Sequence, residues 1–313
     1  MGAARTLGAT PARVAVEDAL HGKRLDLGGI LLHGMLLGSL LLTLTVLAML
    51  LLEVVTSAWS VFAERGLGVV TSDLSSIASR VGVWQGIQGS LWLMAFVVLF
   101  SFPLGIGAAI YIEEYARDTR LTRFINANIR NLAGVPSVVY GLLGLAIFVR
   151  VLGGLTGGRS LISGGMTLAI LVLPIVIITA SEALRAVPGE IREAAYGVGA
   201  TRWETIRSHV LPYAAPGVFT GTILALARAF GETAPLLMVG VATGFLSLGG
   251  GGLVDQLQGP YTALPAIIFR WSKLPQADFR EGLAAAAIVV LLVVLLAVNA
   301  LAIILRNRYE RRW

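Results

Sequence analysis

The sequence has 313 residues, of which 56% are hydrophobic and only 13% charged, and its mean hydropathy is +0.82. These values are typical of a membrane protein and exclude an ordinary soluble domain. The net charge of +6 could suggest a nucleic-acid-binding protein, but the basic residues lie between apolar segments and indicate membrane topology instead.

Six segments are candidates for membrane-spanning helices, each of which needs roughly 20 mostly apolar residues. The first, residues 27–52, follows a polar N-terminal arm, residues 1–26, and is too long for the core of a signal peptide, so we predict a retained anchor. The others are residues 81–112, 131–149, 161–181, a part of 210–254, and 283–305. The sequence therefore predicts an all-α membrane protein with six transmembrane helices.

The basic residues predict how these helices are oriented. Sixteen of the 24 lysines and arginines lie before helix 1, between helices 2 and 3, between helices 4 and 5, and after helix 6. Because cytoplasmic loops carry the excess of positive charge, we expect both termini to be cytoplasmic, including the tail, residues 306–313.

The segments on the opposite side differ in character. Residues 53–80 are expected to form a moderately polar external loop, and residues 245–280 a longer external segment that begins with a glycine run. Phe269 and Trp271 flank Arg270 near its end, which favours either an interfacial helix or re-entrant segment, or a plain surface loop. Pro103 and Pro174 predict kinks in helices 2 and 4.

Residues 181–212 form an unusually long and polar internal loop. Pro188 suits the first turn of a helix, Gly199 suits its C-terminal end, and Thr201 with Glu204 forms the S/T-x-x-E capping pattern that starts a second helix towards Pro212. Helix connections in bundles are usually about 2 to 8 residues long. We therefore predict a helix–turn–helix that docks another protein, the alternative being an idle amphipathic loop.

Arg228 and Glu232 interrupt the run 210–254, which otherwise has no charge. Their spacing of four places them on one face of a helix, and an ionisable residue inside a membrane indicates a functional site. The alternative is a buried ion pair that only fixes the helix register. Metal sites are not expected, because cysteine is absent and the three histidines lack ligand spacing.

The internal loop resembles the EAA loop of the permeases of ATP-binding-cassette (ABC) importers, through Glu193, Ala194 and Ala195, then Gly199, then Leu211 and Pro212. His209 stands where members of that family usually have isoleucine. The resemblance implies a type I importer permease (MetI-like) fold over the core, residues 81–305, and makes the loop a cytoplasmic coupling helix that fits a groove on an ATPase.

Further stretches, among them "FPLGIGAAIYIEEYA", "NLAGVPSVVYGLLGL" and "ALARAFGETAPLL", resemble the phosphate permeases of the PstA family. That resemblance implies that Arg228 and Glu232 line a phosphate pathway. Ile178 departs from it, since relatives often carry an arginine there.

The family resemblance also implies partners: a homologous PstC-like permease, a PstB-like ATPase dimer that hydrolyses ATP with magnesium, and an external PstS-like phosphate-binding protein. This chain has no P-loop motif, so we expect it to be a transporter subunit rather than an enzyme and to bind no cofactor of its own. The expected location is a bacterial inner membrane. A permease for sulfate or molybdate and an ion-driven secondary transporter are the alternatives.

Overall fold

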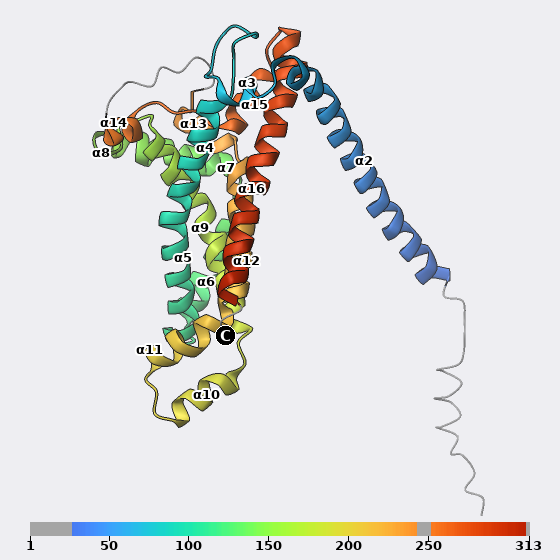
Figure 1. Cartoon of the computed structure of the whole chain (residues 1–313). Coiled ribbons are helices and arrows are strands. Elements are labelled where there is room, and N and C mark those ends of the chain that lie inside the picture. The colour runs from blue at the N-terminus through green and yellow to red at the C-terminus, as the bar shows by residue number, and fades with distance from the viewer. Residues whose placement is uncertain (1–26, 243–251, 311–313) are drawn as a thin grey trace, which may run out of the picture. The chain divides into compact units, whose positions relative to one another are not determined.

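The computed structural model describes residues 27–242 and 252–310, and every regular element in these ranges is a helix (Figure 1). The chain divides into two compact units, Met1–Glu53 and Val54–Trp313. The first unit contributes the greater part of helix α2 (Leu27–Arg65), and the second contains a helical bundle. The other helices are α3 (Gly68–Thr71), α4 (Trp84–Phe96), α5 (Phe102–Ile110), α6 (Arg120–Ala133), α7 (Ser137–Gly144), α8 (Gly153–Thr156), α9 (Leu161–Arg185), α10 (Gly189–Gly197), α11 (Arg202–Thr205), α12 (Leu211–Gly231), α13 (Ala234–Val239), α14 (Leu253–Gln258), α15 (Leu264–Trp271) and α16 (Ala284–Glu310).

Short π-helical turns join several of these helices into longer ones. Helices α4 and α5 form one continuous span, Trp84–Tyr115, and helices α11 and α12 form another, Arg202–Gly231. The π-helical turn Val97–Ser101 lies just before Pro103, which removes a hydrogen-bond donor from the helix. Pro174 lies buried inside α9, which is a single helix over its 25 residues.

Five helices in the described ranges are long and apolar enough to cross a membrane, and a bent pair gives a sixth. The pair joins Arg120–Ala133 to Ser137–Val151 at an angle of 100°. The single helix predicted for residues 131–149 is therefore wrong. Pro136 disfavours helical geometry at the residue before it and cannot donate a backbone hydrogen bond, so the helix is interrupted here.

Helix α2 is longer than predicted and continues to Arg65, so residues 53–65 are not part of a loop. It ends where Gly66 takes the left-handed conformation, with φ of 55°. Arg65 then donates hydrogen bonds to the carbonyls of Ala78 and Val81, at 2.9 and 2.7 Å, which tie the following segment to the end of the helix.

Helix α9 is the centre of the bundle. It packs against α4, α5, α6, α7, α12 and α13, and most of its side chains are buried. Gly105 of α5 makes one of these contacts possible, because a Cβ there would lie only 2.7 Å from Cγ1 of Val176. Close approach at small residues is the usual way in which helices associate in a membrane.

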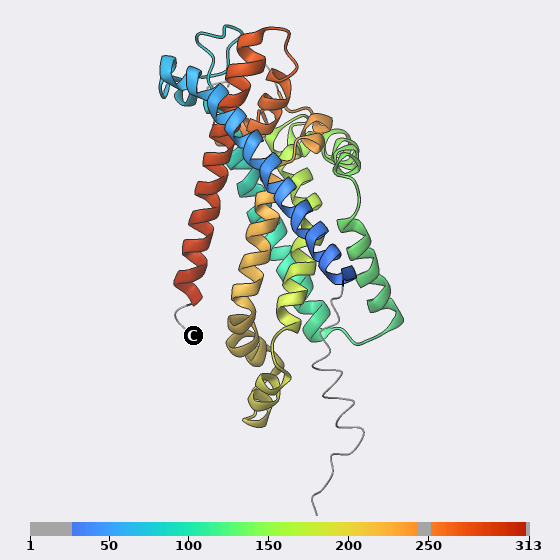
Figure 2. The ribbon, with the colours of Figure 1, turned by 90° about the vertical axis from the view of Figure 1, so that its right-hand side faces the viewer.

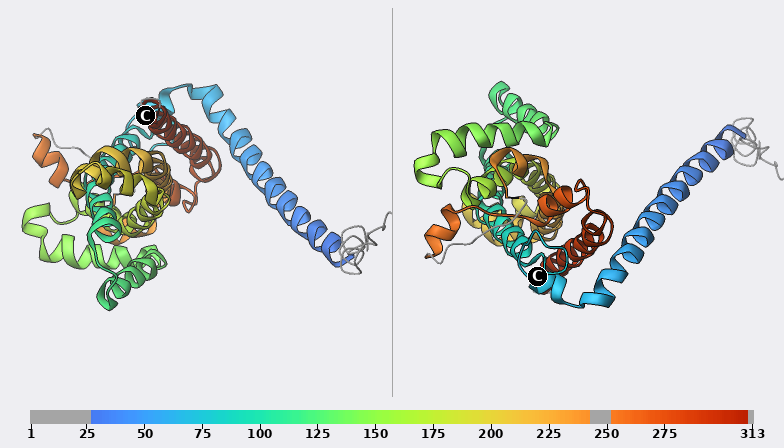
Figure 3. Two further views of the ribbon diagram at one scale, coloured as in Figure 1. Left: turned by 90° about the horizontal axis from the view of Figure 1, so that it is seen from below. Right: turned by 90° about the horizontal axis from the view of Figure 1, so that it is seen from above.

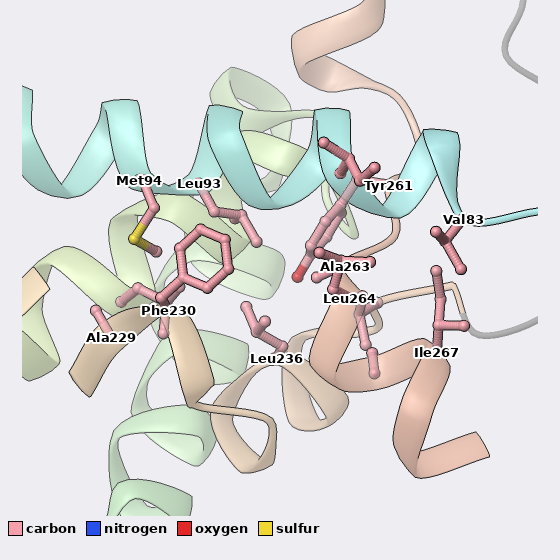
Figure 4. Close-up of a cluster of buried hydrophobic side chains, with 14 of the residues drawn as sticks. Val83, Leu93, Met94, Ala229, Phe230, Leu236, Tyr261, Ala263, Leu264 and Ile267 are labelled. Atoms are coloured by element: carbon pink, nitrogen blue, oxygen red, sulfur yellow. The ribbon is translucent and has the colours of Figure 1, made fainter. Parts of the chain in front are cut away.

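A cluster of buried apolar side chains joins α4, α12, α13 and α15 at one end of the bundle (Figure 4). Leu264, Ile267 and Trp271 of α15 are buried in it, so the surface loop considered for this segment is wrong. Phe269 remains partly exposed and lies beneath Lys273, whose Nζ is 3.9 Å from the ring centroid. The glycine run of the predicted external segment, residues 249–252, lies outside the described residues except for Gly252.

The bundle of the second unit has two distinct ends. Helix α10 lies at the end opposite α15, together with the C-terminal end of α16 (Figures 1 and 2). The views along the bundle show α6 and α7 running along one side of it (Figure 3). We refer to these ends as the α10 end and the α15 end.

Candidate functional site

Arg228 lies in the last turn of α12, where a positive charge is favoured by the partial negative charge of the helix C-terminus. Its Nε is 3.6 Å from Oε1 of Glu232, so the predicted ion pair is present. The helical geometry expected for the pair is wrong, because α12 ends at Gly231 and Glu232 has an extended backbone with ψ of 119°. The pair therefore spans a helix end.

The two side chains differ in exposure. That of Arg228 is 55% exposed in this chain, whereas that of Glu232 is 18% exposed. Within the described part of the chain, the side chain of Arg228 makes this ion pair and no hydrogen bond. A guanidinium has five donors, so most of its hydrogen-bonding capacity is available to a ligand. The arrangement differs from an ion pair buried inside this chain's own bundle.

Arg228 belongs to an uncovered face of α12. The exposed residues of this helix recur at helical spacing along its length and include Tyr213, Thr220, Leu224 and Arg228. Thr220 and Arg228 are polar, unlike the large apolar side chains that α2 exposes. We call this surface the open face of α12.

Arg306 reaches the open face from α16. Its Nη1 donates a hydrogen bond of 2.9 Å to Oγ1 of Thr220. The sequence interpretation counted Arg306 only as a topological charge of the C-terminal tail, but α16 continues through it to Glu310. No local pattern indicated this contact, since the two residues are 86 positions apart.

Two interrupted helices pack together beside this site. Helix α13 begins just after Glu232 and lies against α7, which begins just after the break at Pro136. The contact depends on Gly141, because a Cβ there would lie 2.7 Å from Cα of Pro235 and 2.9 Å from Cβ of Met238. Interrupted helices at membrane depth are tolerated where they are buried in protein or line a cavity.

We predict that Gly141→Leu lowers the free energy of unfolding by about 1–3 kcal/mol, because the added side chain meets backbone atoms that cannot move aside. The unfolding temperature of the detergent-solubilised protein measures the effect. The control is Gly107→Leu in α5, since a Cβ at Gly107 meets nothing within 4 Å. Equal unfolding temperatures for the two variants would contradict the close packing of α7 on α13.

The predicted helix–turn–helix is partly confirmed. Helix α10 begins after Pro188, Gly199 has φ of 87° in the turn, and Thr201 and Glu204 form a capping box at the start of α11. The second helix was predicted to run towards Pro212, and it continues past that residue without a break to Gly231. Pro212 is tolerated in the first turn of α12, where π-helical geometry precedes it.

The EAA-loop residues divide into two groups. Glu193, Ala194 and Gly199 are exposed at the α10 end, while Ala195 is buried and anchors α10. Leu211 and Pro212 are half-buried at the base of α12, where Leu211 packs against a small apolar cluster that includes Val210 and Ala214. Only the first group is therefore fully exposed on the surface of this chain.

The chain was compared with known proteins. Residues 101–313 match the family described as binding-protein-dependent transport system inner membrane components. The chain is 32% identical over 278 residues to phosphate transport system permease protein PstA 1 of Mycobacterium tuberculosis (strain CDC 1551 / Oshkosh), covering 88% of this chain and 87% of that one. It is 37% identical over 224 residues to PstA of Yersinia pestis, with 71% of each chain covered. It is also 35% identical to the probable ABC transporter permease protein YqgI of Bacillus subtilis (strain 168), of whose length it covers 56%.

A solved structure agrees with the fold. The bacterial alginate ABC transporter in complex with an alginate pentasaccharide-bound periplasmic protein matches with a TM-score of 0.62, at 16% identity, over 90% of this chain and 95% of that one. This likeness confirms the predicted all-α permease fold. The chain belongs to the family of binding-protein-dependent transport system inner membrane components, the membrane permeases of ABC importers.

Proposed function

We propose that the chain is one of two permease subunits of an ATP-driven phosphate importer. The observation that carries the proposal is Arg228, a guanidinium with free donors on the open face of α12, in a chain whose relatives are named phosphate permeases. A planar guanidinium can hold two oxygens of a phosphate ion at once. Glu232 reduces the net charge of the site, so that phosphate is attracted without being trapped.

The open face of α12 needs a second subunit. Thr220 and Arg228 are exposed in this single chain, and the guanidinium of Arg228 is too polar to face hydrocarbon. A homologous permease facing α12 would enclose them in a pathway between the two subunits. Rocking of the two subunits would open this pathway alternately to each side of the membrane.

ATP hydrolysis is assigned to a separate pair of ATPase subunits with their magnesium ions. We place the α10 end in the cytoplasm, where Glu193, Ala194 and Gly199 would contact one ATPase. Both chain termini would then be cytoplasmic, and the α15 end would receive an external phosphate-binding protein. The membrane would be the inner membrane of a bacterium.

The experiment is uptake of labelled phosphate into liposomes that contain the chain with its partner permease, ATPase and binding protein. We expect uptake that requires ATP and that excess unlabelled phosphate suppresses, while excess sulfate or molybdate does not. Suppression by sulfate or molybdate instead would reassign the importer to another oxyanion. Uptake driven by an ion gradient without ATP would indicate a secondary transporter.

A further inference from the structure

Three consecutive residues at the α10 end of the second span each contact a different arginine. Glu113, Glu114 and Tyr115 form the last turn of the helix Trp84–Tyr115. Their partners are Arg185, Arg192 and Arg202, which all belong to the segment that contains α10. We call Glu113, Glu114 and Tyr115 the acidic triplet.

The first contact holds the end of α9. Nε and Nη2 of Arg185 donate hydrogen bonds of 2.7 and 2.8 Å to the two carboxylate oxygens of Glu113. This bidentate geometry is the strongest form of an arginine–carboxylate contact. Glu113 has only 11% of its side chain exposed, so solvent screens the pair weakly on that side.

The second contact holds α10 itself. Nη2 of Arg192 lies 2.7 Å from Oε1 of Glu114, whose side chain is 6% exposed. The same guanidinium also donates to the carbonyls of Val187 and Leu184, at 2.8 and 3.0 Å. Arg192 thus joins α10 both to the second span and to carbonyls at and just after the C-terminal end of α9.

The third contact holds the start of the helix that leads to Arg228. The guanidinium carbon of Arg202 lies 5.0 Å from the ring centroid of Tyr115, which is the geometry of a cation–π contact.

An exposed ion pair at the same end of the bundle differs from these three contacts. Asp118 and Arg123 are 3.6 Å apart with side chains 83% and 68% exposed, and such surface pairs contribute little.

We propose that the acidic triplet clamps the second span to the coupling segment, so that α10, the end of α9 and the start of α11 move with the span Trp84–Tyr115 as one body. The two ion pairs bridge 72 and 78 residues of sequence, and the side chains of their carboxylates, Glu113 and Glu114, are 11% and 6% exposed. The acidic triplet, Arg185 and Arg192 are positioning residues. Through these contacts, a displacement of α10 would also displace the span Trp84–Tyr115, although no adjacent loop connects this span to α10.

The functional consequence rests on the proposed role of α10 in coupling, but the rigidity can be measured by itself. The chain has no cysteine, so spin labels can be placed at Arg117→Cys, just after the acidic triplet, and at Gly197→Cys on α10. A side chain at Gly197 meets nothing within 4 Å. The distance between the labels is measured in the assembled importer with and without an ATP analogue.

The clamp predicts one narrow distance that is the same in both nucleotide states. In the double variant Glu113→Gln and Glu114→Gln we expect the distance distribution to broaden and to differ between the states. We also expect the phosphate transported per ATP hydrolysed to fall about tenfold in that variant. The control is Asp118→Asn, which removes the exposed pair at the same end and should change neither measurement.

Two results would overturn the clamp. The first is a label-to-label distance that differs by more than about 2 Å between the nucleotide states while Glu113 and Glu114 are intact. The second is an unchanged narrow distance in the double variant. A charge swap separates loss of the ion pair from misfolding. Glu113→Arg alone should broaden the distance distribution, and the double variant Glu113→Arg with Arg185→Glu should restore the narrow distance if the charge pair is responsible. Failure of the unmodified complex to transport phosphate would instead refute the proposed function, while the distances would still decide the clamp.

Discussion

Replacing Arg228 with alanine is expected to reduce ATP-dependent phosphate uptake at least about 100-fold. Two charge-assisted hydrogen bonds from a guanidinium to phosphate contribute about 3 kcal/mol or more, which corresponds to that factor. Arg228→Lys should retain part of the uptake, because an ammonium keeps the charge but cannot form the bidentate contact. Uptake of labelled phosphate by liposomes containing the assembled complex measures both variants.

The control for Arg228 is Leu104→Ala, which changes an exposed apolar side chain on α5, outside the open face of α12. It should transport at nearly the normal rate. Normal transport by Arg228→Ala would show that the ion pair with Glu232 only stabilises the helix end, and the pathway would have to be sought elsewhere. Co-purification of the partner subunits with each variant verifies that assembly is intact.

Glu193→Lys is expected to uncouple ATP hydrolysis from transport. Glu193 is exposed on α10, the element that we propose contacts the ATPase, so reversing its charge would place a like or unpaired charge in that contact. We expect ATPase stimulation by the phosphate-loaded binding protein to fall about tenfold or more. The measurement is the ATPase rate of the reconstituted complex with and without the binding protein.

Asp118→Lys is the matched control for Glu193→Lys. It makes the same charge reversal at the same end of the bundle, at a residue with 83% of its side chain exposed and only a long ion pair to Arg123. Stimulation should be unaffected. If Asp118→Lys and Glu193→Lys reduced stimulation equally, net charge at this end would explain the result and α10 would have no specific role.

Apolar length predicted most of the spans, because any helix that crosses hydrocarbon must meet the same requirement. It failed where a residue inside an apolar run changes the backbone. Residues 131–149 were predicted as one helix, but Pro136 interrupts them and the two parts meet at 100°. Composition also misplaced residues 53–65, which contain no glycine or proline and continue α2 up to Gly66.

The candidate site was predicted as a set of residues but not as an arrangement. The spacing of Arg228 and Glu232 suggested a pair on one helical face, and the ion pair does form. The helix nevertheless ends between them. Pro235, which follows the pair, lacks an N–H donor, yet α12 has already ended at Gly231.

The sequence by itself determined the features that depend on composition and on near neighbours: the apolar spans, the capping box at Thr201, the EAA loop and the presence of a charged pair in an apolar run. Only the tertiary structure decided that Arg228 faces outward and that Glu113 and Glu114 hold Arg185 and Arg192. The physical reason is distance along the chain. A cap forms within one turn, whereas a contact across more than 70 residues exists only after α5 packs against α9 and brings their ends together.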